Sequence, residues 1–199
     1  MKRRIFLWGL SNGISALSVA GLFWLGLALG PYADRVDWYV DALVMLLVYG
    51  SCAACIWGAV LIRRRSGFKR EDLKSSNSDL RTGNRKTVIA FLGVVVIQAL
   101  LVGSAVIVCN HYDKPDLIWS FVALIVSMHF VPLGRIFGVS FYYWVGILGC
   151  IAAIGSFACP APYRMMSVGI AMGTLMLASS AYLVWRGDAL APSAEENPV

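Results

Sequence analysis

Six long apolar stretches alternate with short polar segments along this chain. Together they make up about two thirds of the sequence and cover residues 5–29, 39–62, 87–109, 117–137, 139–159 and 165–185. Each is about as long as the 20 mostly apolar residues that a helix needs to cross a bilayer. Backbone groups in lipid must be hydrogen-bonded within their own segment, so the pattern predicts six transmembrane helices. The ten-residue alternation typical of a membrane β-barrel does not occur.

Composition supports a membrane protein without a soluble domain. Hydrophobic residues make up 59% and charged residues 14% of the chain, whereas charged residues reach about 25% in soluble domains. We therefore predict an all-α fold, a six-transmembrane-helix bundle over residues 1–186. A basic loop at 63–86 joins the second and third helices, and the polar tail at 187–199 is expected to be disordered.

The distribution of Lys and Arg predicts the orientation of the bundle. The N-terminus, the loop at 63–86 and the ends of helices four and six carry 14 of these cations, and the opposite side carries three. Because cytoplasmic segments are enriched in Lys and Arg, both termini are predicted to be cytoplasmic, in a bacterial inner (plasma) membrane. The net charge of +6 follows from this asymmetry and does not indicate nucleic acid. We expect the basic loop to attract anionic lipid headgroups, which makes membrane lipids the predicted partners.

The first predicted helix has two specialised faces. One face carries Ser11, Asn12, Ser15 and Ser18, and the opposite face carries Gly9, Gly13, Ala16 and Ala20. Small residues allow two helix backbones to approach closely in a membrane. The polar face has two open interpretations: hydrogen bonds that hold helices together, or the wall of a polar pocket.

Small residues also line the last two predicted helices. They are Gly146, Gly149, Ala153 and Ser156 on the fifth helix, and Gly169, Gly173 and Ser180 on the sixth. This pattern predicts tight helix packing or a homo-oligomer.

The fourth predicted helix ends in an unusual segment that contains His129, Pro132 and Arg135. Pro132 lacks a backbone N–H and clashes with the carbonyl of Met128, so we expect a kink or an unwound turn beside His129. Ionisable residues within a span are expensive and point by default to function. The alternative is a neutral imidazole that hydrogen-bonds to a neighbouring helix.

Depth along the helices brings several polar residues to one level. At 1.5 Å per residue, Asn12 and His129 lie at nearly equal depth on the cytoplasmic side of the membrane. The predicted ligand-binding residues of this pocket are Asn12, Ser15, Gln98, His129, Arg135, Ser179 and Tyr182. Pro132, Gly9, Gly13, Gly169 and Gly173 are predicted to have structural roles.

The segment His129-Phe130-Val131-Pro132-Leu133-Gly134-Arg135-Ile136-Phe137, followed by Phe141-Tyr142-Tyr143, resembles a pattern in small multi-pass bacterial membrane proteins. The resemblance covers about a fifth of the chain. It implies a membrane location for the segment and no particular activity, substrate or cofactor.

Two pairs of cysteines have alternative interpretations. Cys52 and Cys55 form a C-x-x-C spacing, which is typical of thiol oxidoreductases, but cysteines within an apolar helix usually act as small hydrophobic residues. Cys109 and Cys159 end helices three and five on the outer side, where an oxidising compartment permits a disulfide.

Motifs for catalysis and metal binding are missing from the sequence. No H-E-x-x-H, G-x-S-x-G or G-x-x-x-x-G-K-[ST] motif occurs, and we predict no catalytic residue, cofactor or metal site. The grouping of His111, Asp113 and Asp116 is interpreted as a solvated turn.

These patterns leave three functions open. The first is binding or passage of a small solute or lipid-like molecule through the cytoplasmic-side pocket. The second is a non-catalytic membrane scaffold or accessory subunit, and the third is a membrane thiol or quinone enzyme.

The charge distribution generates a topology prediction. A reporter that is active only in the cytoplasm should work when it is fused after Val199 or inserted near Ser76. A reporter that is active only outside should work near Asp113. The opposite activity at any of these positions would disprove the predicted orientation.

Overall fold

The computed structural model of the chain describes the backbone of residues 2–29, 38–66, 78–137 and 139–190. It describes the side chains of residues 10–29, 43–64, 89–136 and 139–186. This part of the chain is helical and contains no strand. The elements are α1 (Lys2–Leu29), α2 (Trp38–Ser66), α3 (Ser78–His111), the short 3₁₀ helix η3 (Pro115–Leu117), α4 (Ile118–Phe137), α5 (Phe141–Phe157) and α6 (Ala161–Leu190).

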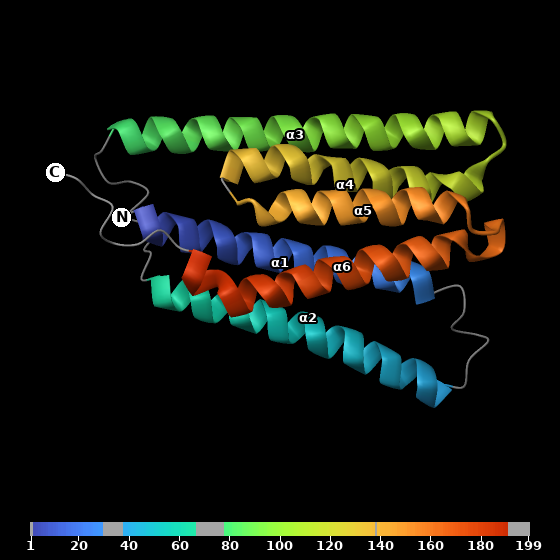
Figure 1. Cartoon of the computed structure of the whole chain (residues 1–199), viewed down its shortest axis with the longest axis horizontal. Coiled ribbons are helices and arrows are strands. Elements are labelled where there is room, and N and C mark those ends of the chain that lie inside the picture. The colour runs from blue at the N-terminus through green and yellow to red at the C-terminus, as the bar shows by residue number, and fades with distance from the viewer. Residues whose placement is uncertain (1, 30–37, 67–77, 138, 191–199) are drawn as a thin grey trace.

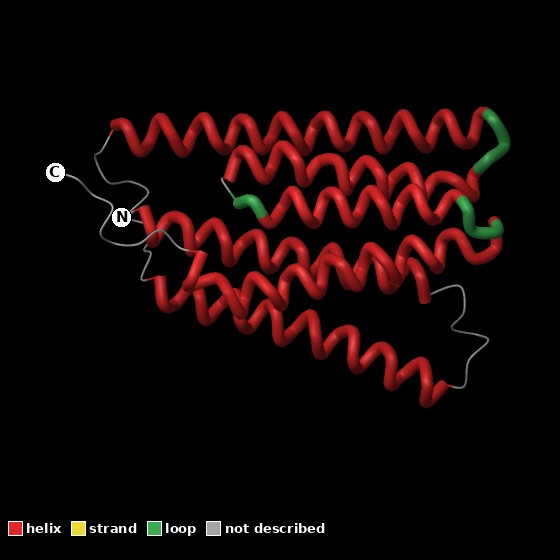
Figure 2. The backbone as a smooth tube through the Cα atoms, in the orientation of Figure 1, coloured by secondary structure: helices red, strands yellow, loops and turns green. Residues whose placement is uncertain are grey.

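The six long helices run side by side and reverse direction at each connection (Figures 1 and 2). The start of α1, the α4–α5 connection and the end of α6 lie at one end of the bundle, which we call the terminal end. The α3–α4 and α5–α6 connections lie at the opposite end, which we call the loop end. Such an even-numbered, up-and-down arrangement brings both described ends of the chain to the same side.

Five helices contain a segment long and apolar enough to cross a membrane. These segments are Leu10–Leu29, Leu43–Arg64, Ile89–His111, Pro115–Ile136 and Ala161–Arg186. The predicted all-α fold and five of the six predicted spans are thus supported by helix length and composition. The remaining helix, α5, has 17 residues, or about 25 Å at 1.5 Å per residue, and is shorter than the hydrocarbon core of about 30 Å.

Several helices extend beyond their apolar segments. The predicted basic loop at 63–86 is partly helical, because α2 continues to Ser66 and α3 begins at Ser78. The expected tail at 187–199 also begins within a helix, since α6 continues to Leu190. Residues 191–199, on which the rest of that prediction depends, lie outside the described residues. Hydropathy marks where an apolar segment lies, whereas a helix continues until its backbone hydrogen bonding ends.

The central contact of the bundle joins α1 and α6, and α6 also packs against α2, α4 and α5. The buried residues of this face of α1 recur three or four positions apart, at Leu10, Ile14, Leu17, Gly21, Trp24 and Ala28. Those of α6 follow a similar spacing, at Val168, Met172, Met176, Ser179 and Leu183. This spacing places one row of side chains on each helix and lets the two rows interlock.

Glycines bring the backbones of α1 and α6 together. A Cβ atom placed on Gly169 would stand 2.7 Å from the carbonyl oxygen of Trp24 and 2.7 Å from the Cβ of Ala28. A Cβ atom on Gly173 would stand 3.0 Å from the carbonyl oxygen of Gly21. Larger residues at these positions would force the helices apart, so the close approach requires glycine.

Small residues also allow α4 and α5 to approach each other closely. A Cβ atom on Gly146 would stand 3.0 Å from the carbonyl oxygen of Ser127. Nearer the loop end, the Ser156 hydroxyl donates a hydrogen bond to Ser120 Oγ over 2.7 Å. The small-residue row of α5 therefore packs against α4 of the same chain.

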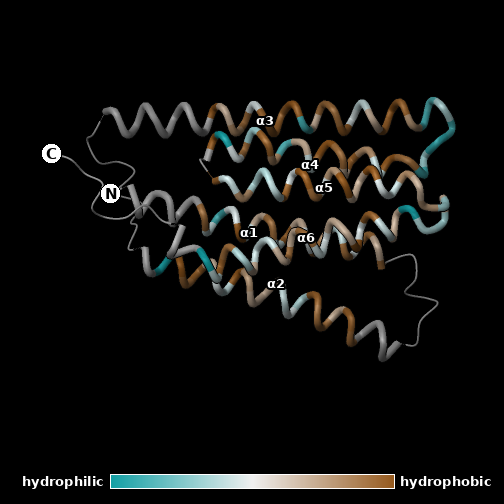
Figure 3. The backbone as a smooth tube through the Cα atoms, viewed as in Figure 1, coloured by the Kyte–Doolittle hydropathy of each residue, from teal (hydrophilic) through white to brown (hydrophobic). Residues whose placement is uncertain are grey.

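Helices α2 and α3 form the outer edges of the bundle (Figure 1). Helix α3 packs mainly against α4, and Cys109 is the one buried residue among its described side chains. Apolar residues dominate the described length of α3, whereas the turn to α4 is hydrophilic (Figure 3). An apolar surface of this extent is rare on a soluble monomer and suits contact with lipid or with other membrane helices.

The α1–α6 contact generates a prediction about stability. Gly169→Ala should destabilise the bundle by about 1–3 kcal/mol, because the added methyl group meets a backbone atom that cannot move without separating the helices. Gly26→Ala on α1 is the matched control, since a Cβ atom there would have no neighbour within 4 Å. Unfolding in detergent, followed by circular dichroism as SDS is added, measures both variants. Equal stability of the two would contradict the proposed role of Gly169.

Candidate functional site

The polar residues predicted on α1 are divided between its buried and exposed faces. Ser11 and Ser18 are buried, whereas Asn12 is exposed. The Ser15 hydroxyl donates a hydrogen bond to the carbonyl oxygen of Ser11, one turn earlier, over 3.1 Å. The expectation that Asn12 and Ser15 would face one pocket is not met, because Asn12 lies on the outer surface of α1.

The predicted small-residue face of α1 is also divided. Ala16 is exposed and Ala20 is half-buried, and α6 approaches α1 at Gly21 instead. Gly13 faces α5, while the surroundings of Gly9 lie outside the described residues.

The serines of α6 lie at the α1–α6 contact. Ser179 and Ser180 are both buried, and the Ser180 hydroxyl donates a hydrogen bond to the carbonyl oxygen of Ile14 over 3.2 Å. The position of Ser180 therefore suits the interpretation of serine as a link between helices.

His129 is half-buried on α4 and contacts its own helix. Its Nδ1 atom is hydrogen-bonded to the carbonyl oxygen of Val126. Since a carbonyl oxygen only accepts, Nδ1 is the donor in this contact, and in the neutral form of the ring Nε2 is then an acceptor. The imidazole also lies against Phe130, with ring centroids 4.5 Å apart. No unwound turn accompanies it, because α4 remains helical through Pro132.

Gln98 is half-buried on α3, at a depth similar to that of His129 on α4. Gln98 precedes the end of α3 at His111 by 13 residues (111 − 98), and His129 follows the start of α4 at Ile118 by 11 residues (129 − 118). The two helices are antiparallel neighbours, so these residues belong to the α3–α4 side of the bundle. The predicted residues on α1 and α6 belong to a different contact.

Tyr142 on α5 occupies the region where the pocket was expected. Its side chain is buried, with 6% exposed, and its ring stacks on Phe130 of α4 at a centroid distance of 6.1 Å. A Cβ atom on Gly13 of α1 would stand 2.6 Å from the Tyr142 hydroxyl oxygen. Gly13 of α1 and Phe130 of α4 therefore both meet Tyr142, and this aromatic side chain fills the space between the two helices.

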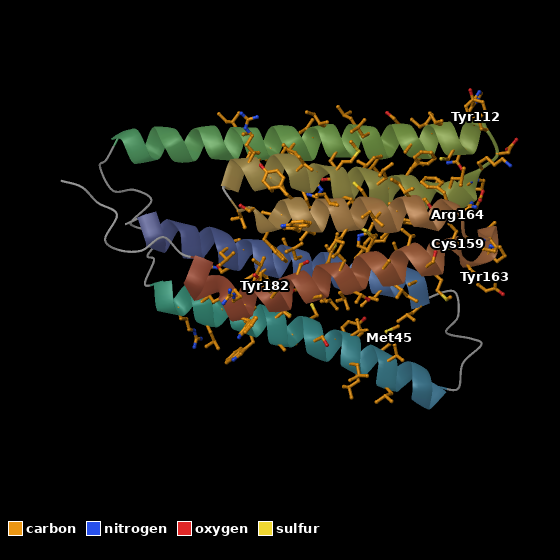
Figure 4. The ribbon with its side chains drawn as sticks, in the orientation of Figure 1. Met45, Tyr112, Cys159, Tyr163, Arg164 and Tyr182 are labelled. Atoms are coloured by element: carbon orange, nitrogen blue, oxygen red, sulfur yellow. The ribbon has the colours of Figure 1, made fainter. Side chains whose placement is uncertain are left out.

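The other two predicted ligand-binding residues lie elsewhere at the terminal end. Arg135 is exposed in the last turn of α4. Tyr182 of α6 stacks on Phe141 of α5 at a centroid distance of 4.7 Å, and its position near the terminal end is visible in Figure 4. The seven predicted residues thus lie on different faces of α1, α3, α4 and α6, with Asn12 and Arg135 on the surface.

The C-x-x-C cysteines pack against α1. Cys52 and Cys55 are free and buried, and the Cys52 thiol donates a hydrogen bond to the carbonyl oxygen of Ser18 over 3.5 Å. This environment suits small hydrophobic residues better than reactive thiols. Cys109 and Cys159 are also free, so the disulfide that the sequence permits is not formed in this structure.

The most extensive polar network among the described side chains lies at the loop end, around Arg164. This side chain is 12% exposed and forms an ion pair with Asp116 of η3. It also donates to the carbonyl oxygens of Ser156 over 3.3 Å, Phe157 over 3.4 Å and Cys159 over 3.0 Å. Figure 4 shows Arg164 and Cys159 together at the end of the α5–α6 hairpin.

The Arg164 network joins the α5–α6 turn to η3, which lies 48 residues earlier in the sequence. The carbonyl groups at the end of α5 lack partners within the helix, and the planar guanidinium group supplies donors in several directions. Asp116 connects the same group to the start of α4. From the sequence, Arg164 is only one of the three cations on the outer side and Asp116 only part of a solvated turn, because nothing in their spacing indicates that they pair.

Among the described residues, no group of three or more His, Cys, Asp or Glu side chains could hold a metal ion. Nor does any buried side-chain nitrogen or oxygen in this part of the chain lack a hydrogen-bond partner. The polar groups that are described inside the bundle are therefore already satisfied by the protein.

Comparisons with known proteins add no functional assignment. The chain matches no protein-family model, no curated protein and no solved structure at a significant level.

The network around Arg164 generates a further prediction. Arg164→Ala should lower the free energy of unfolding by about 2–3 kcal/mol, because Asp116 loses its partner and three carbonyl groups lose a charged donor. Lys114→Ala removes a nearby exposed cation and serves as the control. Stability in detergent should fall only for Arg164→Ala, and in a double-mutant cycle Asp116→Asn should add little to it. Additive effects would show that the two side chains are not coupled.

Proposed function

We propose that this chain is an integral protein of a bacterial inner membrane that acts as a non-catalytic scaffold or accessory subunit. In this proposal all six helices cross the membrane and both termini are cytoplasmic. Residues 139–159, which extend α5 on both sides with apolar or small residues, would make up for the short length of the helix itself.

The observation that carries the proposal is the position of Tyr142. A passage or binding pocket between α1 and α4 would need the volume that this ring occupies against Phe130 and Gly13. The serine hydroxyls on either side are also engaged: Ser180 bonds to α1 and Ser127 bonds to the carbonyl oxygen of Ala123 over 2.7 Å. A bundle whose described polar groups bind one another has few left to recognise a solute.

The exposed faces of α2 and α3 fit a role in association. Large apolar side chains such as Leu46 on α2, and Leu100 and Ile107 on α3, are between 66% and 71% exposed. In a membrane such faces contact acyl chains or neighbouring helices. A homo-oligomer and a complex with another membrane protein are both consistent with this role.

Binding of a small solute or lipid-like molecule is the second candidate. His129 favours it, because a half-buried imidazole has an acceptor nitrogen, Nε2, besides the Nδ1 atom bonded to Val126. An ionisable residue within a span is energetically expensive, and its presence there therefore points to a function. Rearrangement of Tyr142 would be needed to connect His129 with α1. The thiol or quinone enzyme has less support, since Cys52 and Cys55 pack against α1.

Chemical accessibility distinguishes the two candidates. In a variant without native cysteines, His129→Cys should resist a membrane-impermeant maleimide added to inside-out membrane vesicles, whose cytoplasmic face is exposed, because a dry bundle admits no water to that depth. Arg135→Cys, on the same helix but exposed at the terminal end, should react readily and serves as the control. Both should react after denaturation in SDS. Rapid labelling of position 129 in the native protein would overturn the scaffold proposal and favour the pocket.

A further inference from the structure

An aromatic and cationic cluster lies at the terminal end of α5 and α6. The rings of Phe141 and Tyr182 stack at a centroid distance of 4.7 Å, and Tyr182 meets Trp185 edge-on at 6.4 Å. The guanidinium carbon of Arg186 stands 5.5 Å from the centroid of the Trp185 ring. The four side chains therefore form one continuous surface, which we call the α5–α6 cluster.

This cluster is open to the surroundings of the bundle. Trp185 is 77% exposed, Tyr182 is 36% exposed, and Arg186 is exposed as well. Trp185 is thus the most exposed of the large hydrophobic side chains described. A tryptophan at this level is typical of the boundary between acyl chains and headgroups, where its ring is apolar and its N–H group meets polar atoms.

Arg186 lies at the end of the apolar part of α6, where acyl chains meet headgroups. It is the last residue of the apolar segment Ala161–Arg186, so its charge lies at the level of lipid phosphates when α6 crosses a membrane. Within the described residues no carboxylate pairs with it, and the ring of Trp185 is its described partner. Contact with the ring face restrains the guanidinium group and leaves its N–H donors for another ligand.

We propose that the α5–α6 cluster binds an anionic phospholipid in the leaflet at the terminal end. The guanidinium group of Arg186 would donate paired hydrogen bonds to the headgroup phosphate, a geometry that suits its planar fork. Trp185, Tyr182 and Phe141 would contact the glycerol and upper acyl region. An anionic lipid is favoured over a zwitterionic lipid because no described carboxylate neutralises this cation.

This site differs from general attraction of lipid by the basic loop. A diffuse positive charge needs no aromatic rings and depends little on which cation is removed. The cluster, in contrast, depends on one arginine and its neighbouring ring. The proposal holds for either function considered above, because neither uses Arg186.

The experiment is native mass spectrometry of the full chain released from detergent with a mixture of phosphatidylglycerol and phosphatidylcholine. The wild-type protein should retain phosphatidylglycerol in preference to phosphatidylcholine. Arg186→Ala should reduce retained phosphatidylglycerol about tenfold, because the charge-assisted hydrogen bonds of the guanidinium group to the phosphate are lost. Trp185→Leu should reduce it to a smaller extent, because the guanidinium group then loses its restraint.

Arg64→Ala is the matched control, because Arg64 is an exposed cation near the terminal end of α2 and is not in the cluster. It should retain phosphatidylglycerol at the wild-type level. Equal losses of retained phosphatidylglycerol in Arg64→Ala and Arg186→Ala would show that only the overall positive charge attracts the lipid and would overturn the proposal. Retention of both lipids to the same extent by the wild-type protein would overturn it as well. Helical content and monodispersity of each variant show whether a loss reflects misfolding.

Discussion

The close approach of α6 to α1 is the constraint on which the rest of the bundle depends. Helices in lipid gain little from the hydrophobic effect when they meet, so their association depends on dispersion contacts over a short distance and on hydrogen bonds. Gly169 and Gly173 allow that distance by placing no side chain between the two backbones. Because α6 also contacts α2, α4 and α5, a change at this contact would be transmitted to most of the bundle.

Serine residues give the bundle specificity without creating a polar interior. Ser18 donates to the carbonyl oxygen of Ile14 over 2.8 Å within α1, Ser180 reaches the same carbonyl oxygen from α6, and Ser156 reaches Ser120 from α5. Each of these donor hydroxyls has an acceptor at short range, so burial leaves none of them unpaired. Polar residues in a membrane helix are therefore ambiguous in sequence, since the same hydroxyl suits a pocket wall and a helix contact.

The sequence predicted the positions of the apolar helices well and their rotations poorly. Hydropathy locates a span, and a rise of 1.5 Å per residue gives depth, which is why Gly13 and Phe130 do meet the same Tyr142 ring. The rotation of each helix about its axis is harder to predict, because lipid-facing and protein-facing positions are both apolar. Asn12, which was expected to face the pocket, lies on the exposed face of α1. The pairing of Arg164 with Asp116 depends on tertiary packing across 48 residues, which no local pattern encodes.

The two ends of the bundle use arginine in opposite ways, and the difference follows from the neighbours of each residue. Arg164 is largely buried, and its donors are used by Asp116, the last carbonyl groups of α5 and the carbonyl group of Cys159 that follows. Arg186 is exposed, and an aromatic ring orients it without using those donors. A cation with its donors occupied holds helices in place, whereas a cation with its donors available attracts a ligand. Counting charges along the sequence assigns each residue only to a side of the membrane, and only the surroundings show which arginine has its donors occupied.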